Sequence, residues 1–405
     1  MAHLPIAVVG AGIGGLRAAE ALRDAGHDGP ITVFGAEGHA PYSRPPLSKD
    51  LLAGQHGSDK IVLRATRDLG DVRWRLGEPV VACDLAARHL TTGDGAEVEF
   101  EGLVVATGVR SRRLSLAGPK IGRYALRGLD DALTLRPLLR EGARLVVIGA
   151  GFIGCEVAAT ARRLGCEVTI VAPEQVPMER PLGFELGAML MRRHLAHDVR
   201  FRLGRGVRAL LGEDRVTGVV LTSGEVLGCD LVVEAVGSVP NVEWLTGNGL
   251  DLANGVNCDE FMRAEGRADV VAVGDVARFP NRMFEGVATR VEHWNIPLET
   301  ARQAAPALLA GLADREPVGP AFAPLPVFWT HQFDIRLQSF GAPGLGLDDV
   351  RVLDGDLDEG PVVMGYHRAG RLVGIVGTGG PRQLLPHRAR LLAEAAPTPR
   401  EPIAG

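Results

Sequence analysis

Two glycine-rich fingerprints constrain the fold of this chain more than any other feature of its sequence. Segment 10–15 reads GAGIGG after the apolar run 6–9, and segment 149–154 reads GAGFIG after the apolar run 145–148. In this order of strand, turn and helix, the first glycine makes the tight turn, the second lets the backbone approach a pyrophosphate, and the third lets the helix pack on the strand. The helix N-terminus offers free N–H groups to the phosphates. Two fingerprints therefore predict two dinucleotide sites.

Length, composition and charge narrow the class of protein. At 405 residues the chain is too long for a single core and suits two or three domains. Its 46% hydrophobic and 23% charged residues fit a soluble globular protein, and its net charge of −5 argues against a nucleic-acid partner. No apolar run approaches the roughly 20 residues that span a bilayer, and the first strand leaves no room for a signal peptide. We therefore expect a cytoplasmic protein without a membrane partner.

The cysteines argue against a metal site. The five positions 83, 155, 166, 229 and 258 are scattered, with no C-x-x-C or other metal-ligand spacing. We therefore expect neither a zinc site nor an iron–sulfur cluster in this chain. Reduced, mostly buried thiols are expected instead, as in cytosolic proteins.

The order of the apolar segments predicts an α/β fold in which one dinucleotide-binding unit interrupts the other. Strand 6–9, helix 16–25 and strand 31–34 form a first βαβ unit, and a second unit begins at residue 145. The strands at 103–108 and 231–237 end in glycine, whereas the strand at 270–275 ends in an acid. This chain order indicates that the first domain resumes after the second.

The last part of the chain predicts a small separate domain. The stretch 314–326 is rich in proline and low in periodicity, which is typical of a linker. Short strands at 362–366 and 372–376 and a helix at 386–395 indicate a small α+β domain. The tail 397–405 is expected to be frayed.

Several further motifs carry a resemblance to a known family. The most specific is the loop that reads PY at 41–42 and RPPLSK at 44–49. Others are ATG at 106–108, VPN at 239–241, VGDVARF at 273–279, VEHWN at 291–295 and FWT at 328–330. Over nearly its whole length the chain resembles the FAD-dependent NAD(P)H:ferredoxin reductases of bacterial mono-oxygenase and dioxygenase systems, relatives of glutathione reductase.

The resemblance implies both an architecture and an activity. The architecture is two Rossmann-like domains and a small C-terminal interface domain, with an FAD-binding domain at 1–109 and 237–320, an NAD(P)H-binding domain at 110–236 and the interface domain at 321–405. The activity is FAD-mediated electron transfer from NADH to a small iron–sulfur ferredoxin, which in turn supplies a haem mono-oxygenase or a ring-hydroxylating dioxygenase. NADPH stays open as the electron donor.

The resemblance also assigns the site residues one by one. Lys49 corresponds to a lysine beside the isoalloxazine ring, Glu156 to its carboxylate partner, and Trp329 to an aromatic that flanks the ring; these three are the expected catalytic residues. Residues expected to bind FAD are Gly10, Gly12, Ile13, Gly14, Gly15, Glu37, Arg44, Lys49, Val80, Ala106, Thr107, Gly108, Arg127, Asp275 and Trp294. Residues expected to bind NAD are Gly149, Gly151, Phe152, Ile153, Gly154, Glu156, Glu174 and Gly237.

The chain departs from the family pattern where the ribose hydroxyls bind. An acid is expected at the end of the second strand of each unit, but Ala36 and Ala172 hold these positions, with Glu37 one step and Glu174 two steps further on. No arginine or lysine follows directly after the second strand of the second unit, which favours NADH, although Arg180 is close enough to bend back. His331 stands where the family has an acid after its C-terminal tryptophan motif.

Other functions of the same fold remain as alternatives. Disulfide reductases need a redox cysteine in the loop after the first unit, but this chain offers Ser43 and Ser48 there. A rubredoxin or nitrite-reductase-type reductase and a non-enzymatic flavoprotein module stay open. An acidic ferredoxin requires a local basic surface, and the candidates, each with a plain solvated face as its alternative, are Arg110, Arg112, Arg113, Arg382, His387, Arg388 and Arg390.

Overall fold

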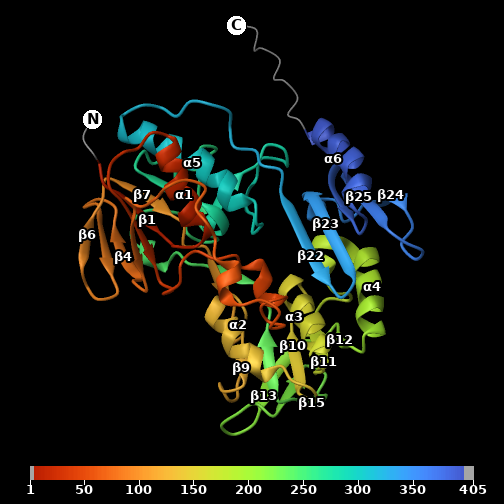
Figure 1. The fold of residues 1–405 in the computed structure, drawn as a ribbon. Helices are drawn as coiled ribbons and strands as arrows, with labels where there is room; N and C mark the ends of the chain where they lie inside the picture. The colour runs from red at the N-terminus through yellow and green to blue at the C-terminus, as the bar shows by residue number, and fades with distance from the viewer. Residues whose placement is uncertain (1–3, 396–405) are drawn as a thin grey trace.

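The computed structural model describes residues 4–395, and Figure 1 shows them in three lobes. The first lobe combines the red and orange N-terminal segments with the cyan helix α5 (Ile296–Leu312). A yellow and green lobe lies below it, and the blue C-terminal lobe lies beside both. Segments from distant parts of the sequence therefore meet where the lobes join.

The first lobe is built on a parallel five-stranded sheet. Its order is β19-β7-β1-β2-β3, and every neighbouring pair is parallel. Helix α5 packs against α1 (Ile13–Asp24). The strands are β1 (Ile6–Val9), β2 (Ile31–Gly35), β3 (Arg73–Leu76), β7 (Gly102–Val105) and β19 (Val270–Ala272). Because β19 follows the second unit in the chain but joins this sheet, the first unit is discontinuous, as the sequence predicts.

The second lobe repeats this arrangement. Its parallel sheet has the order β12-β11-β10-β16-β9, with helix α3 (Phe152–Arg163) following β10. The strands are β9 (Arg123–Tyr124), β10 (Arg144–Ile148), β11 (Glu167–Ala172), β12 (Arg200–Leu203) and β16 (Leu231–Glu234). Helix α4 (Glu179–Ala196) follows β11 and is kinked at Gly183. The α/β fold with two Rossmann-like units is therefore confirmed.

Short elements complete these two lobes. An antiparallel pair, β8 (Val109–Ser111) with β17 (Ser238–Pro240), lies at the two crossings between the units. Helix α2 (Leu129–Leu135) leads into the second unit. The smaller sheets consist of β4 (Val80–Asp84), β5 (His89–Thr92) and β6 (Glu97–Glu99); β13 (Val207–Leu211), β14 (Gly218–Leu221) and β15 (Val226–Gly228); and β18 (Val256–Asn257), β20 (Ala277–Pro280) and β21 (Ala288–Arg290).

The third lobe is the predicted small α+β domain. Its antiparallel sheet has the order β22-β23-β26-β25-β24, and β22 packs against α3 of the second lobe. Helix α6 (Pro381–Ala395) covers β26. The strands are β22 (Val327–Gln332), β23 (Ile335–Gly341), β24 (Val350–Gly355), β25 (Val362–Arg368) and β26 (Arg371–Gly377).

The predicted start of the last helix at residue 386 is wrong. Helix α6 begins at Pro381, and Pro386 lies inside it. A proline is favoured in the first turn of a helix, and Pro381 already takes that place. Leu384 and Leu391 are both buried on one face of α6. Their packing holds the turn before Pro386 and the turns after it in one helix. The predicted frayed tail lies outside the described residues.

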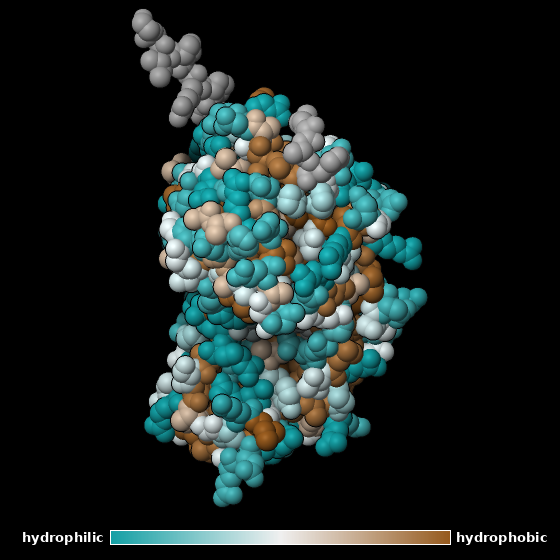
Figure 2. Space-filling model, turned by 90° about the vertical axis from the view of Figure 1, so that its left-hand side faces the viewer, coloured by the Kyte–Doolittle hydropathy of each residue, from teal (hydrophilic) through white to brown (hydrophobic). Residues whose placement is uncertain are grey.

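The face of the molecule drawn in Figure 2 mixes hydrophilic and hydrophobic side chains and narrows between its upper and lower parts. Among residues 4–395, no helix is both long enough and apolar enough to cross a membrane.

Candidate functional site

A cavity of about 1430 Å³ lies at the carboxyl ends of the first sheet and extends to the second fingerprint. Ligands of open parallel sheets bind at this edge. Most of the residues expected at the two sites line this one cavity: Gly10, Gly12, Ile13, Gly14, Glu37, Arg44, Lys49, Val80, Ala106, Thr107, Gly108, Arg127, Asp275, Trp294 and Trp329 from one set, and Gly151, Phe152, Ile153, Glu156 and Gly237 from the other. The fold therefore brings residues expected to bind FAD and residues expected to bind NAD to the same cavity.

The first fingerprint forms a cradle that only glycine permits. Gly10 has a φ of +117°, and a Cβ there would lie 2.1 Å from the Ala106 carbonyl oxygen. A Cβ on Gly15 would lie 1.9 Å from the carbonyl oxygen of Gly10, so this residue allows α1 to pack closely on the turn. A Cβ on Gly12 would meet nothing within 4 Å. The first and third glycines are therefore required by the fold, and the second faces open space that suits a ligand.

The second fingerprint has the same geometry. Gly149 has a φ of +110°, and its Cβ would lie 2.2 Å from the Ala235 carbonyl oxygen. A Cβ on Gly154 would lie 2.1 Å from the carbonyl oxygen of Gly149, whereas a Cβ on Gly151 would meet nothing within 4 Å. Both loops thus leave the same space open before a helix N-terminus. The helices are α1 in one case and α3 in the other.

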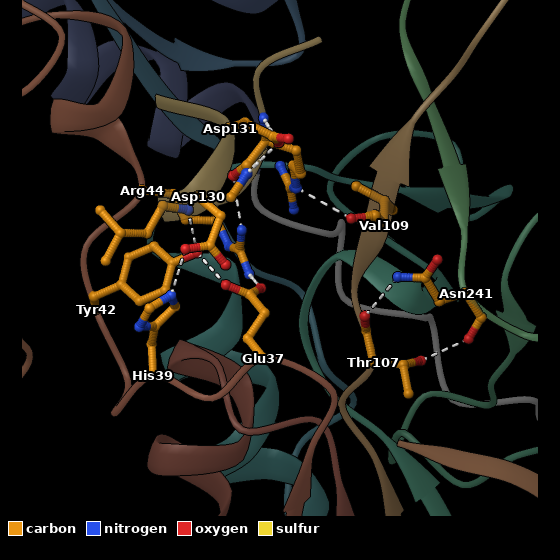
Figure 3. Close-up of polar contacts among 12 residues, drawn as sticks. Glu37, His39, Tyr42, Arg44, Thr107, Val109, Asp130, Asp131 and Asn241 are labelled. Atoms are coloured by element: carbon orange, nitrogen blue, oxygen red, sulfur yellow. Dashed lines mark hydrogen bonds and ion pairs between the residues drawn. The ribbon is translucent and has the colours of Figure 1, made fainter. Parts of the chain in front are cut away.

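Glu37 is fixed inside the first site by a compact set of hydrogen bonds (Figure 3). Arg44 Nη2 donates to Glu37 Oε1 at 2.6 Å, and the Tyr42 hydroxyl donates to the other carboxylate oxygen. Burial acts to raise the pKa of Glu37, but the Arg44 charge and the Tyr42 hydrogen bond outweigh it and hold this pKa below its usual value. Glu37 is therefore an ordered acceptor one step after Ala36.

An ion pair closes the flank of the cavity next to β19. Arg127 Nη2 lies 2.8 Å from Asp275 Oδ2, and Arg127 Nε donates to the Val109 carbonyl oxygen at 3.0 Å. Burial raises the pKa of Asp275 above its usual value, although Arg127 opposes this. The loop after β7 is held to the second crossing, because Thr107 Oγ1 donates to the Asn241 carbonyl oxygen at 2.7 Å (Figure 3).

Lys49 and Glu156 meet where the two units adjoin. Lys49 Nζ lies 2.6 Å from Glu156 Oε2, although the residues are 107 positions apart. Ser48 Oγ donates to the same oxygen at 2.6 Å, and Thr330 Oγ1 donates to Glu156 Oε1 at 2.7 Å. The carboxylate therefore accepts hydrogen bonds from the first unit and from the C-terminal domain. The structure brings together the pair that the sequence predicts, and its catalytic role stays a prediction.

Aromatic side chains wall the cavity around this pair. Trp294 and Trp329 line it, together with Phe328 and Phe152, whose ring centroids lie 4.9 Å apart in an edge-to-face arrangement. His293 also lines the cavity, and burial lowers its pKa to about 4, so the imidazole is neutral at pH 7. In the Lys49–Glu156 pair the lysine side chain is 14% exposed and the glutamate side chain 4% exposed.

Some of the expected site residues lie outside the cavity lining. Gly15, Gly149 and Gly154 stand behind the loops, where they serve backbone packing. Glu174 pairs with Arg180, with 3.0 Å between Oε1 and Nε, and the Arg180 side chain is 83% exposed. The second unit therefore has no counterpart of the Glu37 arrangement.

The basic residues suggested for a partner surface are largely engaged within the chain. Arg110 pairs with Glu243 at 2.6 Å, and Arg113 pairs with the buried Glu234 at 3.2 Å. Near the C-terminus, Arg390 pairs with Glu394 and Arg388 lies over the Phe340 ring.

Sequence reasoning missed the partners that fix the two key carboxylates. Tyr42 is part of the specific loop motif, yet its bond to Glu37 needs a chain reversal that no sequence pattern shows. Thr330 lies 174 positions from Glu156, inside the FWT motif. The motifs pointed to both residues but not to their contacts.

The fold and site define a class of protein. Residues 4–301 match the family described as pyridine nucleotide-disulphide oxidoreductase, and residues 327–404 match the reductase C-terminal family. The chain belongs to the pyridine nucleotide-disulphide oxidoreductase family and is an oxidoreductase.

Particular relatives refine this class. The chain is 34% identical over 402 residues to rhodocoxin reductase of Rhodococcus erythropolis, which covers 98% of this chain and 92% of the relative. It is 36% identical to the anthranilate 1,2-dioxygenase system ferredoxin--NAD(+) reductase component of Burkholderia cepacia, covering 98% and 96%. Among solved structures, it resembles the reductase in the covalent putidaredoxin reductase–putidaredoxin complex, with a TM-score of 0.88, 30% identity and coverage of 97% and 94%.

Proposed function

We propose that this protein is a ferredoxin reductase that holds FAD on the first fingerprint and receives electrons from NADH bound on the second. Its electron acceptor is a small iron–sulfur ferredoxin, which supplies a haem mono-oxygenase or a ring-hydroxylating dioxygenase. The observation that carries the proposal is the 2.6 Å contact between Lys49 and Glu156, because it joins the loop of one unit to the helix of the other inside one cavity. The named activities of the relatives support the same conclusion.

The residues around the first loop fit FAD. The space beside Gly12 admits a pyrophosphate, and the N-terminus of α1 points its N–H groups there. Glu37 offers a fixed carboxylate to ribose hydroxyls, and Asp275 also lines the cavity. FAD supplies the step that this reaction needs, since it takes up two electrons as a hydride and passes them on one at a time.

The protein's own contribution is position and charge. Lys49 Nζ is tied to Glu156 and to the Pro45 carbonyl oxygen at 3.0 Å, so a fixed ammonium faces the cavity. Such a group stabilises negative charge that develops near it. Gly151 and the N-terminus of α3 would hold the nicotinamide nucleotide. Hydride transfer requires no acid or base here, so approach geometry determines the rate.

The domain boundaries follow from the same arrangement. We assign the FAD domain to 1–109 and 237–320, the NAD domain to 110–236 and the interface domain to 321–405. The crossing pair β8–β17 supports the two inner boundaries, because its strands begin at Val109 and Ser238. The cysteines 83, 155, 166, 229 and 258 are all free thiols, which supports a location in the cytoplasm.

Stopped-flow reduction of the purified flavoprotein tests the proposal. We expect rapid bleaching of the flavin by NADH, slower bleaching by NADPH, and cytochrome c reduction that depends on added ferredoxin. Rubredoxin in place of ferredoxin tests the alternative acceptor. Cytochrome c reduction that ignores both carriers contradicts the electron-transfer assignment, and slow reduction with a stable charge-transfer complex favours the non-enzymatic module.

A further inference from the structure

A line of buried hydrogen bonds leads from Glu156 into the interior between the second unit and the C-terminal domain. Thr330 Oγ1 donates to Glu156 Oε1 at 2.7 Å, and Gln332 Nε2 donates to Thr330 Oγ1 at 3.1 Å. Gln332 Oε1 lies 2.8 Å from His194 Nε2. None of these four residues is more than 3% exposed. The line therefore operates without competition from water.

In every hydrogen bond of this line, the donor lies on the His194 side and the acceptor on the Glu156 side. The Gln332 amide uses its N–H on Thr330, so its oxygen remains to accept from His194. The Thr330 hydroxyl accepts from Gln332 and has its single proton free for Glu156. Hydrogen bonds aligned in this way polarise one another and strengthen the last bond in the series. The last bond is the one on Glu156.

His194 is held as the neutral tautomer that donates a hydrogen bond from Nε2. Its Nε2 faces an amide oxygen and must carry the proton, while its buried Nδ1 has no hydrogen-bond partner. Burial lowers the pKa of His194 to about 4, so the ring is neutral at pH 7. The rings of Phe201 and Phe333 pack edge-on against it, at 5.9 and 5.1 Å between centroids. Ring packing thus fixes its orientation.

The line crosses two domain contacts. His194 belongs to α4, Gln332 and Thr330 belong to β22, and Glu156 belongs to α3. From Glu156 the contact passes to Lys49 in the first unit. Trp329, which lines the cavity, is the neighbour of Thr330 on the same strand. The hydrogen bonds therefore set where β22 lies relative to the Lys49–Glu156 pair.

We propose that Thr330, Gln332 and His194 are positioning residues, which hold Glu156 in the orientation that keeps the Lys49 ammonium at the flavin. None of the three needs to touch the cofactor. The inference rests on the proposed function, since it assigns the effect of Lys49 to bound FAD. Without the Thr330 hydroxyl, Glu156 Oε1 loses this donor and the Gln332 amide loses its acceptor, so both buried groups turn away from their present partners.

The test compares Thr330→Val with Thr330→Ser in the FAD-loaded protein. Valine keeps the volume and removes the hydroxyl, whereas serine keeps the hydroxyl. We expect Thr330→Val to slow flavin reduction by NADH about tenfold and to shift both the flavin reduction potential and the visible spectrum. Thr330→Ser should keep the rate, the potential and the spectrum close to those of the wild type. His194→Phe, which removes the first donor but keeps a ring, is expected to shift the potential in the same direction by a smaller amount.

A matched control separates positioning from loss of stability. Thr92 on β5 is 1% exposed, donates to the Asp94 carboxylate at 2.6 Å and does not itself line the cavity, although its pairing partner Val80 on β4 does. Thr92→Val is expected to lower stability as much as Thr330→Val while leaving the potential and spectrum unchanged. If both variants change the potential alike, a positioning role is contradicted.

A double variant identifies the route of the effect. If Thr330 acts through Glu156 on Lys49, then Thr330→Val adds little to a Lys49→Met background. Additive effects on the potential overturn the proposal, as does a wild-type potential in Thr330→Val or His194→Phe. Failure of the proposed function is seen separately, because the wild-type protein then shows no reduction by NADH.

Discussion

The two glycine loops share a backbone but differ in what surrounds them. In both, a Cβ on the first or third glycine would meet a carbonyl oxygen at about 2 Å, and a Cβ on the second would meet nothing. Around the first loop, Glu37 is fixed by Tyr42 and Arg44 inside the cavity. Around the second, Glu174 pairs with an exposed arginine outside it.

This difference indicates how one fold holds a resident and an exchangeable ligand. A carboxylate with fixed partners loses little freedom when a ribose binds, so the first loop is preorganised for tight binding. A carboxylate on a surface ion pair must exchange that partner for the ligand. We infer that the first loop retains its dinucleotide while the second releases it in each cycle.

Alanine at the third glycine of each loop is expected to produce the largest effect. Gly15→Ala places a methyl group 1.9 Å from the Gly10 oxygen and Gly154→Ala places one 2.1 Å from the Gly149 oxygen, so each costs about 3 kcal/mol of stability. FAD content and thermal unfolding measure the result. Gly15→Ala should purify without FAD, whereas Gly154→Ala should retain it. Equal loss of FAD in both variants contradicts the assignment of the loops.

Acid is expected to destabilise both regions through one imidazole in each. His293 lines the cavity beside the first unit and His194 lies in the second, and burial lowers both pKa values from 6.5 to about 4. Because the folded-state pKa lies below the unfolded one, the stability is full above pH 6.5 and is lost as the pH falls towards 4. At pH 5 each histidine should lower the free energy of unfolding by about 2 kcal/mol.

Denaturant unfolding of the apoprotein at pH 7.5 and pH 5 measures this loss. His293→Asn and His194→Asn should each reduce the difference between the two pH values by about 2 kcal/mol. A difference that is unchanged in both variants rules out these two imidazoles as its cause.

Alanine at the middle glycine of each loop is expected to weaken the binding of one ligand without changing the stability of the fold. Gly12→Ala and Gly151→Ala meet no protein atom within 4 Å, so both apoproteins should unfold at the wild-type temperature. Because the added methyl group occupies the ligand's space, Gly12→Ala should weaken FAD binding about tenfold and Gly151→Ala should raise the KM for NADH about tenfold. FAD reconstitution and steady-state kinetics measure the two effects. A rise in the NADH KM alone from Gly12→Ala would reverse the assignment.

Neutralising the two carboxylates is expected to give the smallest effects. Glu37→Gln leaves Arg44 without its charged partner and should weaken FAD binding about fivefold. Glu174→Gln removes only a surface ion pair, so the KM for NADH should change less than about twofold. Isothermal titration with FAD measures the first effect, and steady-state kinetics with NADH measure the second. A larger effect at Glu174 than at Glu37 contradicts the contrast between the two regions.

The sequence predicted the parts of the molecule that depend on local pattern. Both glycine loops, the strands around them and the interruption of the first unit were readable, because turn glycines and apolar runs leave a short-range signal. The position of α6 was not, since burial of Leu384 and Leu391 on one face outweighs the break that Pro386 suggests.

The sequence predicted which residues belong to the site but not the contacts between them. The family motifs identified Lys49 and Glu156, which the structure places 2.6 Å apart. The hydroxyl donors to Glu156, Ser48 and Thr330, lie 108 and 174 positions away from it in the sequence, and hydrogen-bond direction depends on the three-dimensional arrangement. Likewise, only the structure shows that Glu37 enters the cavity whereas Glu174 pairs outside it.

A crystal structure of the FAD-loaded protein soaked with NAD⁺ tests the central claim most directly. The account predicts one FAD per chain with its pyrophosphate at Gly12, a nicotinamide nucleotide with its pyrophosphate at Gly151, and the Lys49 ammonium beside the flavin. Density for FAD at Gly151, or a nicotinamide nucleotide at Gly12, would contradict it.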